Sequence, residues 1–198
     1  MKDWTGGRTS IFKTLGASNH SSRDRQQEDY YATDPIAAKL LLEQETFIGP
    51  IWECACGEKH LSKVFELSGF TVRSSDIVNR CNNEVYDFLS NDNTFWNGNI
   101  ITNPPYKFAT DFIYKALDII PQGRKVAMFL KVQFLEGKQR RKLFENYPPH
   151  TVYVSSSRIL CAPNGEFEQQ KKQGSAVAYA WFVWIKGYKG DAIIKWIN

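Results

Sequence analysis

The sequence lacks a metal-binding cysteine pattern and a long apolar run. Its four cysteines (Cys54, Cys56, Cys81 and Cys161) do not show the gap of roughly two to four residues typical of structural zinc sites. No disulfide framework and no secretory leader are recognisable, so we expect a reducing, cytoplasmic compartment and no bound metal. The apolar runs are too short and too interrupted to span a bilayer, so no membrane partner is expected.

A strong charge of either sign is also missing. The chain has 25 Lys and Arg against 21 Asp and Glu, a net charge of +4, which permits a polyanionic partner without requiring one. With 42% hydrophobic and 14% aromatic residues among 198, the composition favours one compact globular domain. No repeat or linker is visible. We predict a domain over residues 30–198, preceded by a polar segment over residues 1–29 that is either a mobile terminus or an arm that orders over a ligand.

The apolar pattern alternates between strand-like and helix-like segments. An apolar run over residues 51–56 precedes Leu61, Val64 and Phe65 at helical spacing, and a second strand follows over residues 71–77. This order predicts a βαβ unit with parallel strands. Further strands are predicted at 99–102, 125–131, 151–156 and 175–186, helices at 36–42, 108–120 and 137–147, and a short closing segment at 193–197. The fold class is therefore α/β.

Two acidic residues at predicted strand ends favour a nucleoside ligand. Glu53 opens the turn Glu53-Cys-Ala-Cys-Gly57, and Asp76 follows Gly57 by 19 residues. In nucleoside-binding α/β folds, an acid about 20 residues beyond the glycine turn accepts hydrogen bonds from the ribose hydroxyls. An ordinary tight turn and a solvated aspartate are the alternative. A phosphate-binding loop of the Gly-x4-Gly-Lys-Ser/Thr type does not occur in the sequence.

The tetrapeptide Asn103-Pro-Pro-Tyr106 follows the apolar strand over residues 99–102. Its two prolines remove backbone donors and restrict the chain, so the Asn103 amide oxygen and a neighbouring carbonyl form a rigid, donor-poor lip. Such a lip can accept two hydrogen bonds from an NH2 group, and Tyr106 offers a stacking face for a planar base. The alternative is a structural Pro-Pro turn with a packed tyrosine, which would give the two acceptors and the aromatic face no chemical role.

This tetrapeptide, together with the upstream Glu-x-x-x-Gly turn and the strand-end Asp, resembles the S-adenosylmethionine-dependent amino-methyltransferases. It looks most like the DNA adenine-N6 methyltransferases, in a small form of the phage or prophage type, and the resemblance covers Tyr30 to Phe134. It implies a Rossmann-like, seven-stranded, mostly parallel sheet with helices on both faces, the class I methyltransferase fold. It also implies that the first and fourth strands are neighbours, so that Glu53 and Asn103 lie on adjacent strand ends.

The resemblance further implies methyl transfer from S-adenosyl-L-methionine to the N6 amine of adenine in DNA, with the base flipped into the site. The catalytic residues would be Asn103, Pro104, Pro105 and Tyr106. The cofactor would be bound by Tyr31, Thr33, Pro35, Glu53, Cys54, Ala55, Gly57, Asp76, Ile77, Asp87, Phe88 and Asn103. The target would be bound by Tyr106, Phe108, Lys131, Lys138, Arg140 and Arg141, within basic elements over residues 131–147 and 162–174.

Other targets and a loss of activity are also compatible with these residues. The same lip would accept the amine of adenine in RNA or of glutamine in protein, although glutamine-modifying relatives carry an extra N-terminal helical domain, and the segment before Tyr31 is short and polar. The chain departs from the family at Lys59, where a second glycine is usual. A decayed cofactor turn would make the protein an inactive nucleic-acid-binding relative. The recognition sequence and the oligomeric state stay open.

Overall fold

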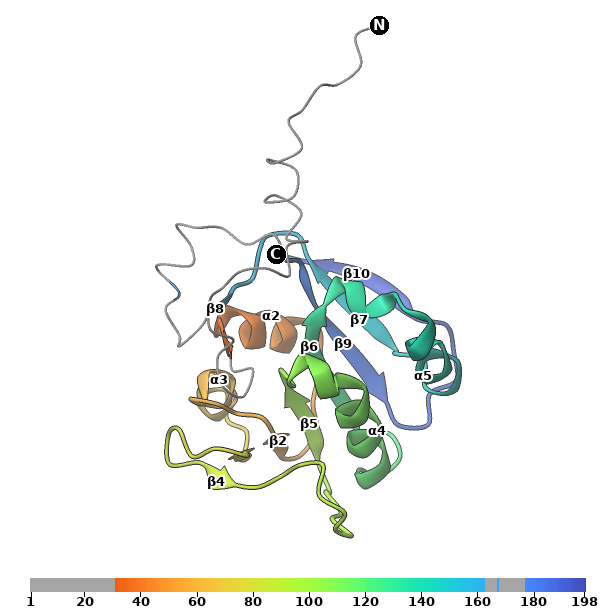
Figure 1. The fold of residues 1–198 in the computed structure, drawn as a ribbon. Helices are drawn as coiled ribbons and strands as arrows, with labels where there is room; N and C mark the ends of the chain where they lie inside the picture. Colours follow the sequence, from red (N-terminus) through yellow and green to blue (C-terminus); the bar gives the residue numbers. More distant parts are fainter. Residues whose placement is uncertain (1–30, 163–166, 168–176) are drawn as a thin grey trace, which may run out of the picture.

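The computed structural model of the protein describes residues 31–162, 167 and 177–198 (Figure 1). Its centre is an eight-stranded sheet with the strand order β10-β7-β9-β6-β5-β2-β3-β4. The strands are β2 (Ile51–Glu53), β3 (Val72–Asp76), β4 (Glu84–Val85), β5 (Asn99–Thr102), β6 (Lys125–Lys131), β7 (Thr151–Ser155), β9 (Tyr179–Ile185) and β10 (Ile193–Ile197). Only β9 runs antiparallel to its neighbours, β6 and β7, within this sheet.

This arrangement confirms the predicted α/β fold and most of its topology. The strands β2 and β5 are neighbours, as the resemblance implied, and β2, the helix over residues 60–67 and β3 form the predicted βαβ unit. The sheet has one strand more than the seven expected, because residues 193–197 pair in parallel with β7 and bury Ile197 in the core. The proposed arm over residues 1–29 and most of the basic segment over residues 162–174, including Lys171 and Lys172, lie outside the described residues.

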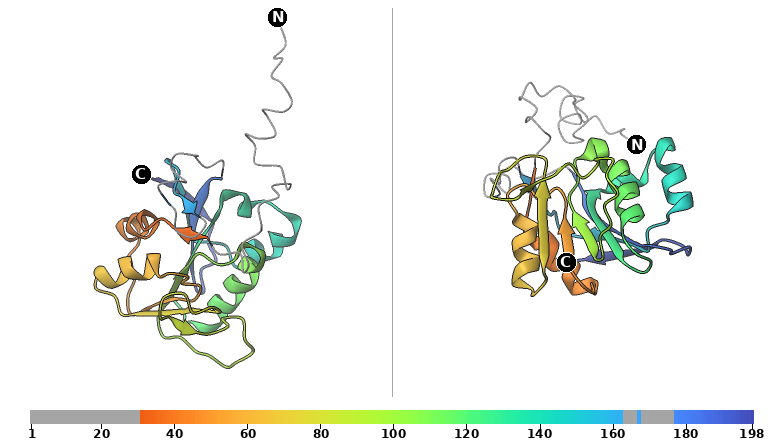
Figure 2. Two further views of the ribbon diagram at one scale, coloured as in Figure 1. Left: turned by 60° about the vertical axis from the view of Figure 1, so that its left-hand side comes forward. Right: turned by 90° about the horizontal axis from the view of Figure 1, so that it is seen from below.

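The α-helices of the described residues cover both faces of the sheet (Figure 2). On one face lie α2 (Ile36–Gln44) and α3 (His60–Leu67), and on the other α4 (Ala109–Ile119) and α5 (Arg141–Asn146). Alternate residues of β6 enter the two cores, with Met128 packing on the α4 side and Phe129 on the α2 side. Because both faces are covered, β6 is an uninterrupted apolar run rather than an alternating one.

The helix starts follow from local residues. At α2, the Asp34 carboxylate accepts a hydrogen bond from the Ile36 N–H at 3.0 Å, and Pro35 already has helical dihedral angles. Before α4, the 3-10 helix η2 (Tyr106–Phe108) closes with Phe108 N–H donating to the Pro105 carbonyl. The predicted helix over residues 137–147 is shorter than expected.

A glycine and an arginine account for that shortening. Gly137 has φ 120°, outside the helical region, and only the 3-10 helix η4 (Lys138–Arg140) precedes α5. The Arg140 guanidinium donates to the carbonyl oxygens of Phe134, Gln133 and Glu136, which fixes the loop around the 3-10 helix η3 (Val132–Leu135) in a non-helical path.

A second, two-stranded sheet was not predicted. It pairs β1 (Ala32–Thr33) with β8 (Cys161–Ala162) in an antiparallel register that sets Thr33 opposite Cys161. The Asp34 N–H extends this pairing by donating to the Leu160 carbonyl at 3.0 Å. The strand β4 was also missed, since its two residues lie in an Asn-rich stretch that reads as irregular.

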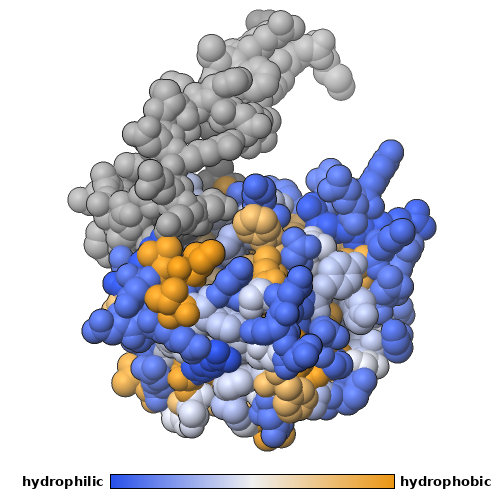
Figure 3. Space-filling view, turned by 60° about the horizontal axis from the view of Figure 1, so that its bottom comes forward, coloured by the Kyte–Doolittle hydropathy of each residue, from blue (hydrophilic) through white to orange (hydrophobic). Residues whose placement is uncertain are grey.

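The surface offers small apolar groups rather than one large patch on the face drawn in Figure 3, which is mostly hydrophilic. The exposed large hydrophobic residues, such as Ile48, Leu67 and Phe95, come from separate segments. Across residues 31–162, 167 and 177–198, no helix combines the length and apolarity needed to cross a membrane. No cluster of potential metal ligands was found among those residues either.

Candidate functional site

A cleft of about 1250 Å³ opens at the carboxyl ends of β2, β3, β5 and β6. Pockets for small ligands have volumes of roughly 300–1,000 Å³, so this cleft can hold a nucleoside-type cofactor and a second planar group together. Of the predicted site residues it is lined by Tyr31, Thr33, Glu53, Cys54, Ala55, Asp76, Ile77, Asp87, Phe88, Asn103, Pro104, Pro105, Tyr106, Phe108 and Lys131. Pro35, Gly57, Lys138, Arg140 and Arg141 are not in this lining.

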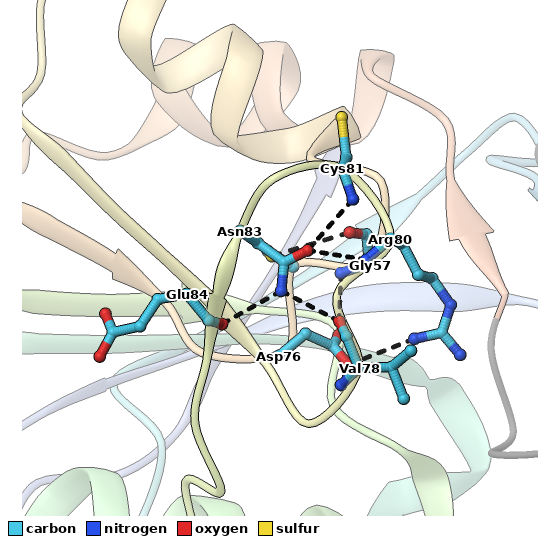
Figure 4. A network of polar contacts seen from close by, with 8 residues as sticks. Gly57, Asp76, Val78, Arg80, Cys81, Asn83 and Glu84 are labelled. Carbon is cyan, nitrogen blue, oxygen red and sulfur yellow. Dashed lines mark hydrogen bonds and ion pairs between the residues drawn. The ribbon is translucent and has the colours of Figure 1, made fainter.

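One end of the cleft is organised around Asp76, the last residue of β3 (Figure 4). Its Oδ2 accepts a hydrogen bond from the Gly57 N–H at 2.9 Å, and its Oδ1 accepts one from the Val78 N–H at 3.1 Å. The Arg80 guanidinium lies 3.4 Å from the same Oδ1. Gly57 has φ 50°, a conformation that favours glycine, and this turn brings its N–H to the carboxylate. The carboxylate is therefore fixed in place by three donors.

The loop between β3 and β4 is held by the buried Asn83. Its Oδ1 accepts hydrogen bonds from the N–H groups of Arg80 and Cys81, and its Nδ2 donates to the carbonyls of Val78 and Glu84 (Figure 4). These four hydrogen bonds satisfy backbone groups that have no strand or helix partner in an irregular loop. The loop is thus ordered before any ligand is bound.

These groups fit the nucleoside part of a cofactor. A carboxylate offers about four lone-pair positions, and the three donors on Asp76 leave one for a ribose hydroxyl. Ile77, which follows Asp76, is 64% exposed and offers an apolar surface for a base. Asp87 and Phe88 lie on the same cleft, with the Asp87 carboxylate accepting a hydrogen bond from the Leu89 N–H.

Glu53 lies at the floor of the cleft and is turned toward α3. Its Oε2 accepts hydrogen bonds from the Ser62 N–H at 2.7 Å and from the Ser62 hydroxyl, which also contacts the Ser74 hydroxyl at 2.6 Å. Burial raises the pKa of the Glu53 carboxyl to about 8, against the lowering effect of the Ser62 hydrogen bonds. The carboxyl is therefore mainly neutral at pH 7.

The raised pKa of Glu53 predicts a stability that falls as pH rises. Between the ordinary pKa of 4.5 and the folded-state value of about 8, the folded protein holds one proton more than the unfolded chain, so higher pH favours unfolding. Denaturant titrations from pH 5 to pH 9 should show a loss on the order of 4 kcal/mol. Glu53→Gln should remove this slope. Glu43→Gln, at an exposed position on α2, should keep it, and equal slopes in all three proteins would contradict the assignment.

Asn103 is oriented by the small sheet. Its Nδ2 donates to the Thr33 hydroxyl at 2.8 Å and lies 3.9 Å from the Cys161 sulfur. Both strands of the two-stranded sheet, β1 and β8, which we call the ribbon, therefore hold the amide nitrogen of Asn103. No described residue donates a hydrogen bond to the Asn103 Oδ1 or to the Pro104 carbonyl. Burial raises the pKa of the Cys161 thiol to about 12, which keeps the sulfur neutral. Asn103 and Pro104 both line the cleft, and neither of these two acceptors has a hydrogen-bond donor among the described residues.

Tyr106 and Lys131 stand together at the rim of the cleft. The Lys131 Nζ lies 4.7 Å from the centroid of the Tyr106 ring, and Phe134 contacts the same ring edge-on at 6.4 Å. Tyr106 is 37% exposed and Phe108 41% exposed, so both rings remain accessible from solvent. An ammonium over an aromatic face polarises that face and restrains its rotation.

The other basic residues predicted to bind the target have different surroundings. Arg140 uses its guanidinium within its own loop and stacks over the Phe134 ring at 4.8 Å. Arg141 donates to Glu145 at 2.6 Å on the exposed face of α5, while Lys138 is exposed. Lys131 is the member of this group that lines the cleft.

Several lining residues were not anticipated from the sequence, chiefly Arg80, His60, Cys161 and Tyr179. Arg80 follows Asp76 by four positions, a spacing that could have signalled an ion pair if the loop had been read as structured. Cys161 reaches the cleft through the unpredicted ribbon, and its sequence context carries no such signal.

No protein-family model matches the sequence, and no curated protein matches it. Solved structures do resemble its fold. A candidate class I S-adenosylmethionine-dependent methyltransferase from Listeria monocytogenes is 15% identical, with 94% of this chain and 71% of that chain covered and a TM-score of 0.56. A S-adenosylmethionine-dependent O-methyltransferase from Thermotoga maritima is 13% identical, with 79% and 65% covered and a TM-score of 0.50.

A third neighbour is the type IIG restriction endonuclease BpuSI, which is 14% identical with a TM-score of 0.53. There the match covers 78% of this chain but only 24% of the endonuclease. At identities this low the likeness is one of fold. The chain therefore has the fold of the class I S-adenosylmethionine-dependent methyltransferases.

Proposed function

We propose that the protein transfers a methyl group from S-adenosyl-L-methionine to the N6 amine of adenine in DNA. The observation that carries this proposal is the pair of acceptors, Asn103 Oδ1 and the Pro104 carbonyl, which receive no hydrogen bond from the described residues and stand at the cleft. The structural neighbours are named for different substrates, so the choice of an exocyclic amine depends on this tetrapeptide.

Asp76, Ile77, Asp87 and Phe88 would hold the adenosine part of the cofactor, and the turn Glu53 to Gly57 would lie along its methionine part. When bound, S-adenosylmethionine supplies an electrophilic methyl group on a sulfonium sulfur. Glu53 is mainly neutral at pH 7, so the negative charge of the described residues at this end of the cleft comes from the carboxylates of Asp76 and Asp87. That charge attracts a cationic ligand.

The chain's own residues prepare the amine. Two N–H groups donating to the Asn103 Oδ1 and the Pro104 carbonyl would draw the amine nitrogen out of conjugation with the base and localise its lone pair. Neither acceptor is a base at neutral pH, so the surplus amine proton passes to water after transfer. Thr33 binds the nitrogen of the Asn103 amide, which would leave the oxygen to accept from the substrate amine.

Tyr106 would stack on the flipped base, with Lys131 fixing its ring and contributing positive charge toward the nucleic-acid backbone. Phe108 would contact the same base or its neighbour. Planarity, an NH2 edge and a nearby phosphate are the features of the substrate that this rim can recognise.

The proposal is tested by incubating the protein with methyl-labelled S-adenosylmethionine and, separately, DNA, RNA or protein, followed by analysis of the labelled products. We expect label in N6-methyladenine from DNA. Label confined to RNA adenine or to glutamine would replace the proposed substrate with one of those. Tight cofactor binding with no label in any substrate class would overturn the enzymatic proposal and favour an inactive nucleic-acid-binding relative.

A further inference from the structure

Lys59 has a backbone conformation that side chains rarely adopt. Its φ of 62° and ψ of 32° lie in the left-handed region, immediately before α3. Asn82, in the loop between β3 and β4, has φ 49°. Apart from the terminal Asn198, these are the only non-glycine residues with positive φ in the described part of the chain. Such conformations persist where surrounding contacts hold them, and they cluster at functional sites.

A single hydrogen bond joins these two positions. The Lys59 Nζ donates to the Asn82 carbonyl at 3.0 Å, across 23 residues of sequence. The Lys59 backbone is anchored on its own side, because its N–H donates to the Cys56 carbonyl at 2.8 Å and its carbonyl accepts from the Lys63 N–H at 3.1 Å. The side chain therefore ties the loop over residues 77–83 to the turn that follows β2.

The two segments joined in this way form the nucleoside end of the cleft. The turn brings the Gly57 N–H to Asp76, and the loop carries Ile77 and Arg80, which both line the cleft. Asn83 makes the loop rigid internally but bonds only to residues of the loop and of β4 among the described residues. Asp76 joins the turn to the start of the loop, and Lys59 adds a contact from the turn to the far end of the loop, at Asn82.

We propose that Lys59 is a positioning residue for the nucleoside end of the cofactor, holding the loop over residues 77–83 at the spacing at which Asp76 and Ile77 meet the ligand. This inference rests on the proposed function. Preorganisation of this kind lowers the cost of ordering the site on binding, so it acts on cofactor affinity. The methyl-transfer step should be untouched, because Asn103 lies at the end of a different strand, β5.

The test compares four variants of the whole chain. Lys59→Met removes the ammonium and keeps a side chain of similar length, and Lys59→Arg keeps a donor that can reach Asn82. Lys59→Gly removes the donor and also relieves the left-handed conformation. Lys63→Met is the matched control, because Lys63 is exposed on α3, the helix that begins directly after Lys59. Calorimetry with S-adenosylhomocysteine gives the affinity, and amide hydrogen exchange over residues 77–83 in the free protein gives the order of the loop.

We expect Lys59→Met to weaken S-adenosylhomocysteine binding about fivefold and to speed exchange in the loop, with kcat at saturating cofactor unchanged. Lys59→Arg should restore both, Lys63→Met should match the wild type, and Lys59→Gly should bind weakly while melting at a higher temperature than Lys59→Met. Wild-type affinity in Lys59→Met, or equal weakening in Lys63→Met, would overturn the inference.

Failure of the proposed function would look different. A wild-type protein that binds neither S-adenosylmethionine nor S-adenosylhomocysteine would overturn the cofactor assignment and with it the role of Lys59 toward that cofactor. Loop exchange that is then faster in Lys59→Met than in the wild type would show that the hydrogen bond orders the loop but serves another ligand. If Lys59→Met binds S-adenosylhomocysteine with wild-type affinity while the wild type methylates DNA, the role of Lys59 is overturned and the proposed function stands.

Discussion

Asn103→Ala is expected to lower kcat for methyl transfer by about a thousandfold or more while leaving S-adenosylmethionine affinity within about twofold of the wild type. The substitution removes the proposed acceptor Oδ1 of the cleft-lining Asn103, and the Pro104 carbonyl alone cannot draw both amine hydrogens out of the base plane. Cofactor affinity is largely spared because the adenosine end is built on β3 and the loop that follows it. Single-turnover rates and calorimetry separate the two quantities.

Thr33 offers a graded control for this result. Thr33→Val removes the oxygen that binds the Asn103 Nδ2, so the amide can rotate and we expect kcat to fall about tenfold. Thr33→Ser keeps the oxygen and should remain close to the wild type. If Asn103→Ala transfers methyl groups at the wild-type rate, the acceptor pair is not the catalytic device and the central proposal fails.

Asp76→Ala is expected to weaken S-adenosylmethionine binding by roughly a hundredfold and to destabilise the fold by about 2–3 kcal/mol. Both effects have one origin. The carboxylate that would accept the ribose hydroxyl also accepts the Gly57 and Val78 N–H groups and pairs with Arg80. Without it, two backbone donors lose their acceptor and a guanidinium that is mostly buried loses this ion pair. Binding calorimetry and denaturant unfolding measure the two losses.

The matched control removes an acid on the neighbouring strand. Glu84 pairs with Arg73 in a two-pronged contact at 2.9 and 2.6 Å on the exposed face of β4, and it does not line the cleft. Glu84→Gln should leave cofactor affinity unchanged and cost less than about 1 kcal/mol, as exposed ion pairs do. Unchanged cofactor affinity in Asp76→Ala would remove the ribose role from Asp76 and leave it a purely structural one.

Much of the fold and of the cleft was predictable because local patterns determine it. The apolar runs place β2, β3, β5 and β6, and parallel pairing then brings Glu53, Asp76 and Asn103 to one edge of the sheet. The chemistry of the tetrapeptide needs only its four residues. These features are encoded within a few positions of each other, so periodicity and strand-end chemistry are enough to find them.

What could not be predicted depends on contacts between distant residues. The ribbon joins Thr33 to Cys161, two strands of two residues each, too short for any period to emerge. The loop that brings Arg80 to Asp76 is ordered by the side chain of Asn83, which a reading of composition counts as a turn former. The direction of the Glu53 carboxyl depends on Ser62 in another element, and its raised pKa depends on burial. The sequence alone therefore could not predict that this carboxyl is mainly neutral.

The ribbon has a consequence for when the site comes into being during synthesis. The hydrogen bond from Asn103 to Thr33 spans 70 residues, and its contact with Cys161 spans 58 in the other direction. The nucleoside end, by contrast, is closed by contacts of 19 and 23 residues within the β2-α3-β3 region and its following loop. Contacts between distant residues form late, because closing long loops is entropically costly. We therefore expect a growing chain to assemble the nucleoside end first, and the amide of Asn103 to take up its orientation only after residue 161 has emerged.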